Sequence, residues 1–282
     1  MAQFNLKGRF AFTRYQPYVM KYFFSLTLLF LCLGIQAQVK ITYIANEGVL
    51  IQSGDQKVII DALFDKYYDD YLHPSEDLLE TMIAGEAPYN NVNLLLSTHV
   101  HRDHFAPTVT GRFLKGHPET RLISSAQLAK SLADDYAEGA SITAQTEGIV
   151  RDEAIHERTV EGIKVHAFFI YHAGGSRTRS IENMGYIVEL GGLRILHLGD
   201  SDMNPERFAA LDLKSLNIDI AMVPYWYMAD ETGVKIINES IQPKHLLGIH
   251  FPILGSDLAK ENIAKNFPEA HVLTKVHEER SY

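Results

Sequence analysis

The stretch that decides the fold is Ser97-Thr98-His99-Val100-His101-Arg102-Asp103-His104-Phe105, which follows the apolar run Leu94-Leu95-Leu96. Side chains alternate between the two faces of a strand, so His99 and His101 would emerge on one side and bind one ion. Asp103 and His104 are adjacent, and both reach a common site only if the chain turns there. Four ligand-type groups within six residues, at the end of an apolar strand, predict a metal site.

Three later residues can supply the remaining ligands, because each is a polar residue that follows an apolar segment. They are His172 after residues 163–170, Asp200 after residues 195–199, and His250 after residues 246–249. Gly199 beside Asp200 lets the backbone come close to an ion. We therefore expect the metal site to be completed from other strand ends.

Strand and helix signals alternate from residue 38 onward, without a repeat or a linker. Strands are predicted at residues 39–44, 49–51, 57–60, 92–96, 163–170, 185–190, 193–198, 218–223 and 246–249. Helices are predicted at 75–83, where Ser75 caps an amphipathic pattern, and at 126–136, 234–240 and 257–266. This mixture predicts one domain of layered α/β structure, with sheets covered by helices.

The composition is that of an ordinary globular protein: 282 residues, of which 46% are hydrophobic and 22% charged. The net charge of -9 argues against nucleic acid as a partner. The single cysteine, Cys32, lies in the apolar run 23–35, so the rest of the chain has no thiolate for catalysis or metal binding.

Residues 1–37 are interpreted as an N-terminal leader with a signal peptide, and Met20 as the true start. The apolar run 23–35 is shorter than the roughly 20 residues that a membrane-spanning helix needs, and cleavage is expected after Ala37. The mature domain would then be residues 38–282, exported to the periplasm or secreted, with no stable membrane span. The alternative is a leader that is retained as an anchor.

The motif His-x-His-x-Asp-His, followed in order by His172, Gly199-Asp200 and His250, resembles the metallo-β-lactamase superfamily of hydrolases. Residues 183–186, 219–224 and 243–245 look most like the branch that includes the L-ascorbate-6-phosphate lactonase-like proteins. The resemblance implies an α/β fold, a four-layer αβ/βα sandwich, with the site where the two sheets meet at one edge.

The resemblance also implies two ligand sets that share one bridging carboxylate: His99, His101 and His172 for one ion, Asp103, His104 and His250 for the other, and Asp200 between them. Asp61 matches a family position that supports the ligands by hydrogen bonding. His197 lies three residues before Asp200, so it should face the opposite side of the strand and serve as a core or supporting residue.

The chemistry that such a site implies is hydrolysis by a metal-bridging hydroxide, since two divalent ions bring the pKa of bound water from 15.7 toward about 7. Asp103 would orient the hydroxide and later carry a proton to the leaving group. Zinc is the first expectation for imidazole-rich ligation, and manganese or iron also suits a carboxylate-bridged site. No serine or cysteine nucleophile is needed.

The substrate is expected to be a small-molecule ester, lactone or phosphoester. Asp200 stands where penicillin-hydrolysing members have a cysteine, which argues against a penicillinase. Arg177 and Arg179 are candidates for binding a phosphate or carboxylate group, and the aromatic candidates for the pocket wall are Tyr225, Trp226 and Tyr227. Two alternatives stay open: a mononuclear iron oxygenase of the same superfamily, and a non-catalytic metal-binding protein.

Overall fold

The strands form two seven-stranded sheets in the computed structural model, which describes Met1 and residues 38–282. The predicted signal peptide and the start at Met20 lie outside the described residues. The first sheet has the order β14-β1-β2-β3-β4-β5-β6, with β1 (Val39–Ala45), β2 (Gly48–Ser53), β3 (Gln56–Ile60), β4 (Leu94–Leu96), β5 (Arg121–Ser125), β6 (Thr146–Ile149) and β14 (Glu279–Ser281). The second has the order β13-β12-β11-β10-β9-β8-β7, with β7 (Ile155–Val160), β8 (Ile163–Phe169), β9 (Met184–Leu190), β10 (Leu193–His197), β11 (Ile220–Pro224), β12 (His245–Ile249) and β13 (His271–Val272).

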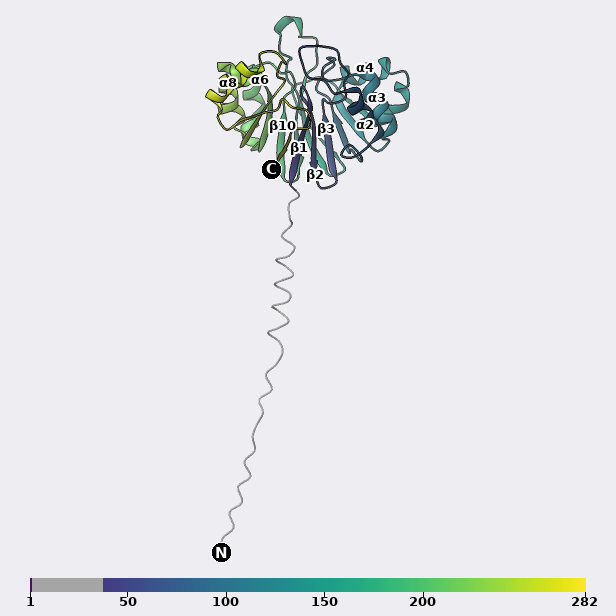
Figure 1. Cartoon of the computed structure of the whole chain (residues 1–282), viewed down its shortest axis with the longest axis horizontal. Coiled ribbons are helices and arrows are strands. Elements are labelled where there is room, and N and C mark those ends of the chain that lie inside the picture. Colours follow the sequence, from purple (N-terminus) through teal and green to yellow (C-terminus); the bar gives the residue numbers. More distant parts are fainter. Residues whose placement is uncertain (2–37) are drawn as a thin grey trace. The chain divides into compact units, whose positions relative to one another are not determined.

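Helices cover the outer face of each sheet (Figure 1). The first sheet carries α2 (Glu76–Ala84), α3 (Pro107–Gly116) and α4 (Ala126–Asp135), and the second carries α5 (Pro205–Leu211), α6 (Tyr225–Ala229), α7 (Glu231–Ile236) and α8 (Ser256–Asn266). Short helical turns are η1 (Gly139–Gln145), η2 (Gly175–Arg177), η3 (Leu213–Leu216) and η4 (Ile237–Ile241).

Side-chain alternation in the strands sorts the apolar residues into three cores. In β3, Val58 and Ile60 face the core between the sheets, whereas Ile59 faces the helices of the first sheet. Val165 of β8 joins Val58 in the central core, and Leu196 of β10 packs with the helices of the second sheet. The result is the predicted four-layer α/β sandwich.

The strand directions bring several chain turns to the same edge of each sheet. β1 and β3 both run antiparallel to β2, and β3, β4 and β5 are parallel. In the second sheet, β8 and β10 both run antiparallel to β9, and β10, β11 and β12 are parallel. Residues that follow β1, β3 and β4 therefore share one edge, and residues that follow β8, β10, β11 and β12 share another.

Helix α2 shows how the local sequence signals act. Ser75 accepts a hydrogen bond from the Leu78 backbone N–H, and Gly85 ends the helix with a φ of 67°. The predicted helix at 75–83 therefore lies within a residue of its observed place. Among the described residues, no helix has the length and apolar character needed to cross a bilayer.

Candidate metal centre

Turns with positive φ angles place polar residues directly after several strands. Asn46 follows β1, Asp61 follows β3 and His250 follows β12, and their φ angles are 49°, 47° and 60°. Positive φ is uncommon for residues other than glycine, and such conformations concentrate at functional sites. Gly199, two residues after β10, has a φ of 56° and precedes Asp200.

The histidine motif lies in a loop, because β4 ends at Leu96. The expectation that His99 and His101 emerge on one face of a strand is therefore wrong in that detail. The loop nevertheless brings the two imidazoles together, with ring centroids 4.7 Å apart. The path of the loop, and not the alternation of side chains along a strand, therefore brings His99 and His101 together.

The first set consists of His99, His101, His172 and Asp200, whose ligand atoms lie within 4.8 Å of one another. The Nε2 atom of His172 is 3.2 Å from Nε2 of His99 and 3.0 Å from Nδ1 of His101. The Oδ2 atom of Asp200 is 3.4 Å from His172 Nε2 and 3.9 Å from His99 Nε2. The three histidines come from two different loops, one on each sheet.

The second set consists of Asp103, His104 and His250, with Asp200 between the two sets. The Oδ2 atom of Asp103 is 3.7 Å from His104 Nε2 and 3.5 Å from His250 Nε2. The Oδ1 atom of Asp200 is 3.3 Å from His104 Nε2 and 3.2 Å from His250 Nε2. One oxygen of Asp200 thus faces each set.

These separations fit metal ions. Ligand bonds of 2.0–2.1 Å in a tetrahedral site place neighbouring ligand atoms roughly 3.3–3.4 Å apart. The His104 and His250 Nε2 atoms and the Asp200 Oδ1 atom are buried without a hydrogen-bond partner among the described residues. The only buried Lys or Arg side chain in the described part of the chain is Lys57, which bonds to Asn90. Divalent cations would satisfy these atoms.

A hydrogen-bond chain fixes the tautomers of two ligands. Asp61 accepts hydrogen bonds from Nδ1 of His104 at 2.9 Å and from the Thr98 hydroxyl at 2.6 Å. The Thr98 hydroxyl in turn lies 3.0 Å from Nδ1 of His99. With each Nδ1 carrying a proton, the Nε2 lone pairs of His99 and His104 face the site, as metal-ligating histidines require.

The pKa values of the two ligand carboxyls, Asp103 and Asp200, are both lowered by their surroundings. Burial raises the pKa of Asp103, but His104 and the contact with His250 outweigh it and leave that pKa below its usual range. Burial likewise raises the pKa of Asp200, and without a metal ion the charges of protonated His250 and His104 more than reverse the effect. Both carboxyls are therefore held as anions, the form that binds cations.

Two residues at the β1 turn, Asn46 and Glu47, belong to this neighbourhood although the sequence indicates only a turn there. Asn46 Nδ2 donates to the Asp103 carboxylate and to its carbonyl oxygen, both at 3.2 Å. Glu47 is fully buried, and burial together with the charge of Asp200 raises the pKa of its carboxyl well above the usual range. A signal that could have identified them is their position after an apolar strand, at the same edge as Asp61.

His197, the last residue of β10, is buried beneath the two sets. Its Nε2 donates to the Glu47 carbonyl oxygen at 3.0 Å, and its Nδ1 accepts from the Gly199 N–H at 3.2 Å. Both ring nitrogens thus have backbone partners. The contacts place His197 where it holds the β1 and β10 turns together.

Aromatic side chains flank His250. The Tyr71 ring lies 4.4 Å and the Trp226 ring 5.2 Å from the His250 ring, centroid to centroid. Burial, followed by the charge of Asp200, raises the pKa of the Tyr71 phenol to about 12, so it stays a hydrogen-bond donor. Tyr225 packs on Trp226, whereas Tyr227 is fully buried in the helical core with its hydroxyl bonded to Ser201 and to the Asp202 carbonyl.

The predicted arginines lie on the loop after His172. The Arg179 guanidinium stacks on the Tyr171 ring at 3.6 Å, and that of Arg151 lies 4.5 Å from the same ring. Arg177 lies in η2 and is exposed. Tyr171 directly precedes His172 in the chain, so the stacked Arg179 lies on the side of the first set.

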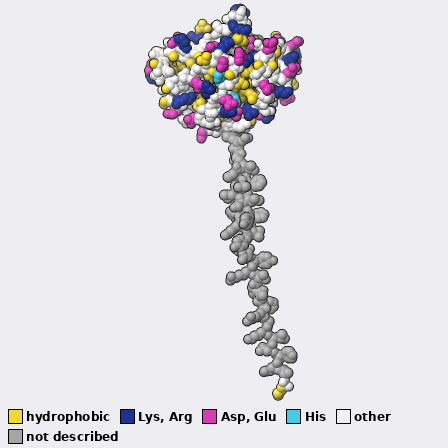
Figure 2. Space-filling model, turned by 180° about the vertical axis from the view of Figure 1, so that it is seen from behind, with side chains coloured by type: hydrophobic (Ala, Val, Ile, Leu, Met, Phe, Trp, Pro, Cys, Tyr) yellow, Lys and Arg dark blue, Asp and Glu magenta, His cyan; other side chains and the backbone are white. Residues whose placement is uncertain are grey.

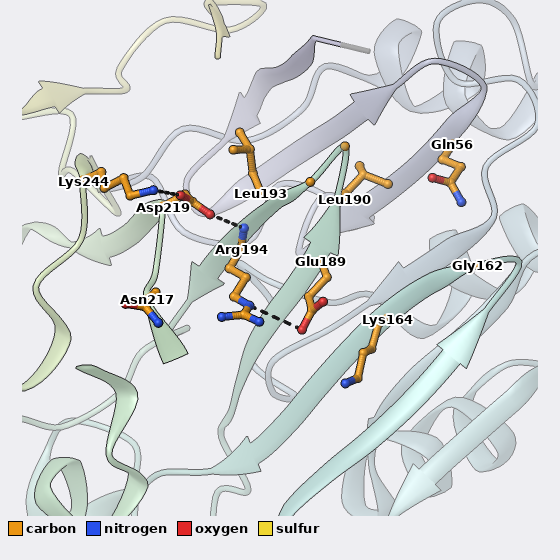
Figure 3. A pocket seen from close by; sticks show the side chains of 12 residues that line it. Gln56, Gly162, Lys164, Glu189, Leu190, Leu193, Arg194, Asn217, Asp219 and Lys244 are labelled. Carbon is orange, nitrogen blue, oxygen red and sulfur yellow. Dashed lines mark hydrogen bonds and ion pairs between the residues drawn. The ribbon is translucent and has the colours of Figure 1, made fainter. Parts of the chain in front are cut away.

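A pocket of about 490 Å³ lies elsewhere, at the edge where β10, β11 and β12 begin (Figure 3). Its charged groups are paired: Lys244 with Asp219 at 2.6 Å, Arg194 with Glu189 at 3.5 Å, and Lys164 with Glu157 at 3.2 Å. The ligands follow the opposite ends of these strands, so this pocket is not part of the metal centre.

Charges of both signs are interleaved on the face of residues 38–282 that Figure 2 shows. Small areas of histidine surface lie near the centre of that face, among hydrophobic side chains. That face offers no broad basic field of the kind that attracts a phosphate backbone.

The family model of the beta-lactamase superfamily domain matches residues 40–250, from β1 to the last histidine of the second set. The chain belongs to this superfamily. The predicted superfamily and its sandwich fold are thereby confirmed, and the lactonase-like branch stays a prediction. This chain is similar to a UPF0173 metal-dependent hydrolase from Pyrococcus furiosus. The two are 26% identical over 221 residues, which cover 76% of this chain and 84% of that one.

Two solved structures are similar in fold. The metallo-beta-lactamase fold protein YhfI from Bacillus subtilis has a TM-score of 0.60 at 14% identity, over 87% of this chain and 100% of that one. CmlA, a diiron beta-hydroxylase from Streptomyces venezuelae, has a TM-score of 0.56 at 15% identity, over 87% of this chain and 54% of that one. The superfamily fold thus accompanies more than one chemistry, and the function must be argued from the site.

Proposed function

We propose that this protein is a metal-dependent hydrolase that binds two divalent ions and cleaves a small ester, lactone or phosphoester. The observation that carries the proposal is the contact between His99 and His172. The His99 Nδ1 bonds to Thr98 and the His172 Nδ1 bonds to the Ala173 carbonyl, so both Nε2 atoms present lone pairs, only 3.2 Å apart. A cation bound between the two lone pairs would satisfy both.

Divalent ions, when bound, polarise the substrate oxygen and lower the pKa of water toward neutrality. The chain's own residues then supply orientation and proton transfer. Asp103 is anionic and its Oδ2 atom is held by the Asn46 amide and faces the second set, so the other oxygen, Oδ1, is the one that can accept a proton and return it to a leaving group. Tyr71 and Trp226 enclose His250 and limit the access of water at that side.

The ion preference follows from the ligand atoms. Five imidazoles from the two sets favour zinc, and the shared carboxylate of Asp200 also accommodates manganese or iron. A mononuclear iron oxygenase is less well supported, because Asp103, His104 and His250 form a complete second set. A non-catalytic metal-binding protein would show the same metal content without turnover.

Arg179 and Arg151 support a substrate with an anionic group. Both guanidinium groups lie on the Tyr171 ring, and the described residues show no ion pair for either one within 4.0 Å. An arginine held by stacking keeps its donors available for a phosphate or carboxylate.

The basic leader and the apolar run 23–35 support export of the protein from the cytoplasm.

The test is turnover of chromogenic phosphodiester, lactone and thioester substrates by purified protein, before and after chelation. Hydrolysis that chelation removes and added metal restores is the expected result. Hydrolysis that survives complete chelation would overturn the proposal. A single bound iron with no hydrolysis would favour the oxygenase instead.

A further inference from the structure

The Glu47 carboxylate has no hydrogen-bond partner within the described residues, although it is fully buried. It follows β1 at the edge where the metal sets converge. The nearest ring nitrogens to its Oε2 are Nδ1 of His104 at 3.9 Å and Nε2 of His197 at 4.0 Å. Both distances exceed those of a hydrogen bond.

Neither of these rings can donate to Glu47. The His104 Nδ1 already bonds to Asp61, and the His197 Nε2 already bonds to the Glu47 backbone carbonyl. The only buried Lys or Arg in the described chain, Lys57, bonds to Asn90. A buried carboxyl group without a hydrogen-bond partner is costly in either protonation state, so something outside the protein's own side chains must satisfy it.

The geometry points to the metal centre. One oxygen of Glu47, one ring nitrogen of His104 and one oxygen of Asp200 lie within 4.8 Å of one another, a separation that could hold an ion. His104 and Asp200 also face the second set. Glu47 also lies within 4.8 Å of Asp61 and His197, but Asp61 already accepts from Thr98 and His104, and both His197 nitrogens already have backbone partners. An ion bound beside Glu47 is therefore the second ion and not an additional one.

We propose that Glu47 is a further ligand of the second metal ion, beside Asp103, His104, His250 and Asp200. The proposal rests on the two-metal function proposed above. It gives the second position three carboxylates and two imidazoles, whereas the first position has three imidazoles and one carboxylate. Carboxylate-rich ligation suits a harder cation such as Mn²⁺ or Fe²⁺, so the two positions should differ in metal preference.

The variant that tests this is Glu47→Gln, which keeps the shape and removes the charge. Wild type and variant are loaded with Mn²⁺ or Zn²⁺ alone and desalted, and the ions per chain are counted by elemental mass spectrometry. The variant should bind the second ion about 10- to 100-fold more weakly, with a larger loss for Mn²⁺ than for Zn²⁺. The first ion should be retained.

Thermal unfolding gives a second readout that does not depend on turnover. The rise in melting temperature on adding Mn²⁺ should be smaller in the variant. Glu189→Gln is the matched control, since Glu189 bonds to His166 at 2.9 Å near the distant pocket and should change neither metal content nor the Mn²⁺ effect.

The outcomes separate the two proposals. If wild type and Glu47→Gln both bind two ions with equal affinity, Glu47 is not a metal ligand, and the hydrolase proposal is unaffected. A wild-type protein that holds no ion would overturn the hydrolase proposal and the role of Glu47 together.

Discussion

The Asp61 carboxylate accepts the Nδ1 proton of His104 at 2.9 Å, which leaves the His104 Nε2 facing Asp200 at 3.3 Å. The same carboxylate accepts hydrogen bonds from the Thr98 hydroxyl and the Thr98 backbone N–H. Asp61 thus orients a ligand of the second set directly, and a ligand of the first set through Thr98. One buried carboxylate couples both sets without facing either ion.

Asp61→Asn should weaken metal binding about 10- to 100-fold, because the amide cannot accept all three hydrogen bonds in the same way. Ions per chain, counted after titration with a chelator of known affinity, provide the measurement. Circular dichroism is the control for folding. Metal retention equal to wild type would show that Asp61 does not orient the ligands.

Asp103→Asn should remove nearly all turnover, by a factor of about 10² to 10⁴, since the amide cannot accept a proton. The fold should be retained, because Asp103 lies in a loop and its Asn46 contact can be kept by an amide oxygen. Rates are measured with the best chromogenic substrate. Undiminished turnover would contradict the role of Asp103 in the reaction.

Gly199→Ala should destabilise the protein by about 1–3 kcal/mol and lower metal retention, because it displaces the turn before Asp200. A Cβ at Gly199 would lie 2.6 Å from Asn183 Oδ1 and 2.7 Å from Thr98 Cβ. Gly175→Ala is the matched control: its φ is also positive, at 67°, but nothing lies within 4 Å of a Cβ there. Equal effects in chemical denaturation would mean that the close approach at Gly199 is unimportant.

Arg179→Ala should raise KM for substrates that carry a phosphate or carboxylate and leave kcat nearly unchanged. The reason is that the stacked guanidinium would bind a part of the substrate that does not react. A neutral ester serves as the comparison substrate, for which KM should not change. An equal rise of KM for both substrates would indicate a general effect on the loop.

Much of the metal centre could be anticipated because its ligands follow apolar strands in a regular way. His172, Asp200 and His250 each come at or just after a strand end, and strand direction alone brings them to one edge. The predicted hairpin at 185–198 appears as β9 and β10. The alternation of apolar and polar residues along a strand, and the residues of a short turn, are local signals, so strands and hairpins can be predicted from the sequence.

The parts that sequence reasoning missed depend on contacts between distant segments. Glu47 is part of an ordinary turn pattern, and its backbone carbonyl is bonded to His197, which is 150 residues away. Helix α3 was not expected, since it contains Gly111, a poor helix former. A Cβ at Gly111 would lie 2.4 Å from the Tyr136 ring, so close packing explains this glycine.

Tyr227 was expected in the pocket wall, but α6 directs it into the core between the second sheet and its helices.

The count of metal ions per chain, by elemental mass spectrometry on the purified protein, tests the central claim most directly. We predict about two divalent ions per chain, lost together with hydrolysis on chelation and regained with it on adding metal. A protein that retains no divalent ion under these conditions would contradict the assignment of His99, His101, His172, Asp103, His104, His250 and Asp200 as ligands.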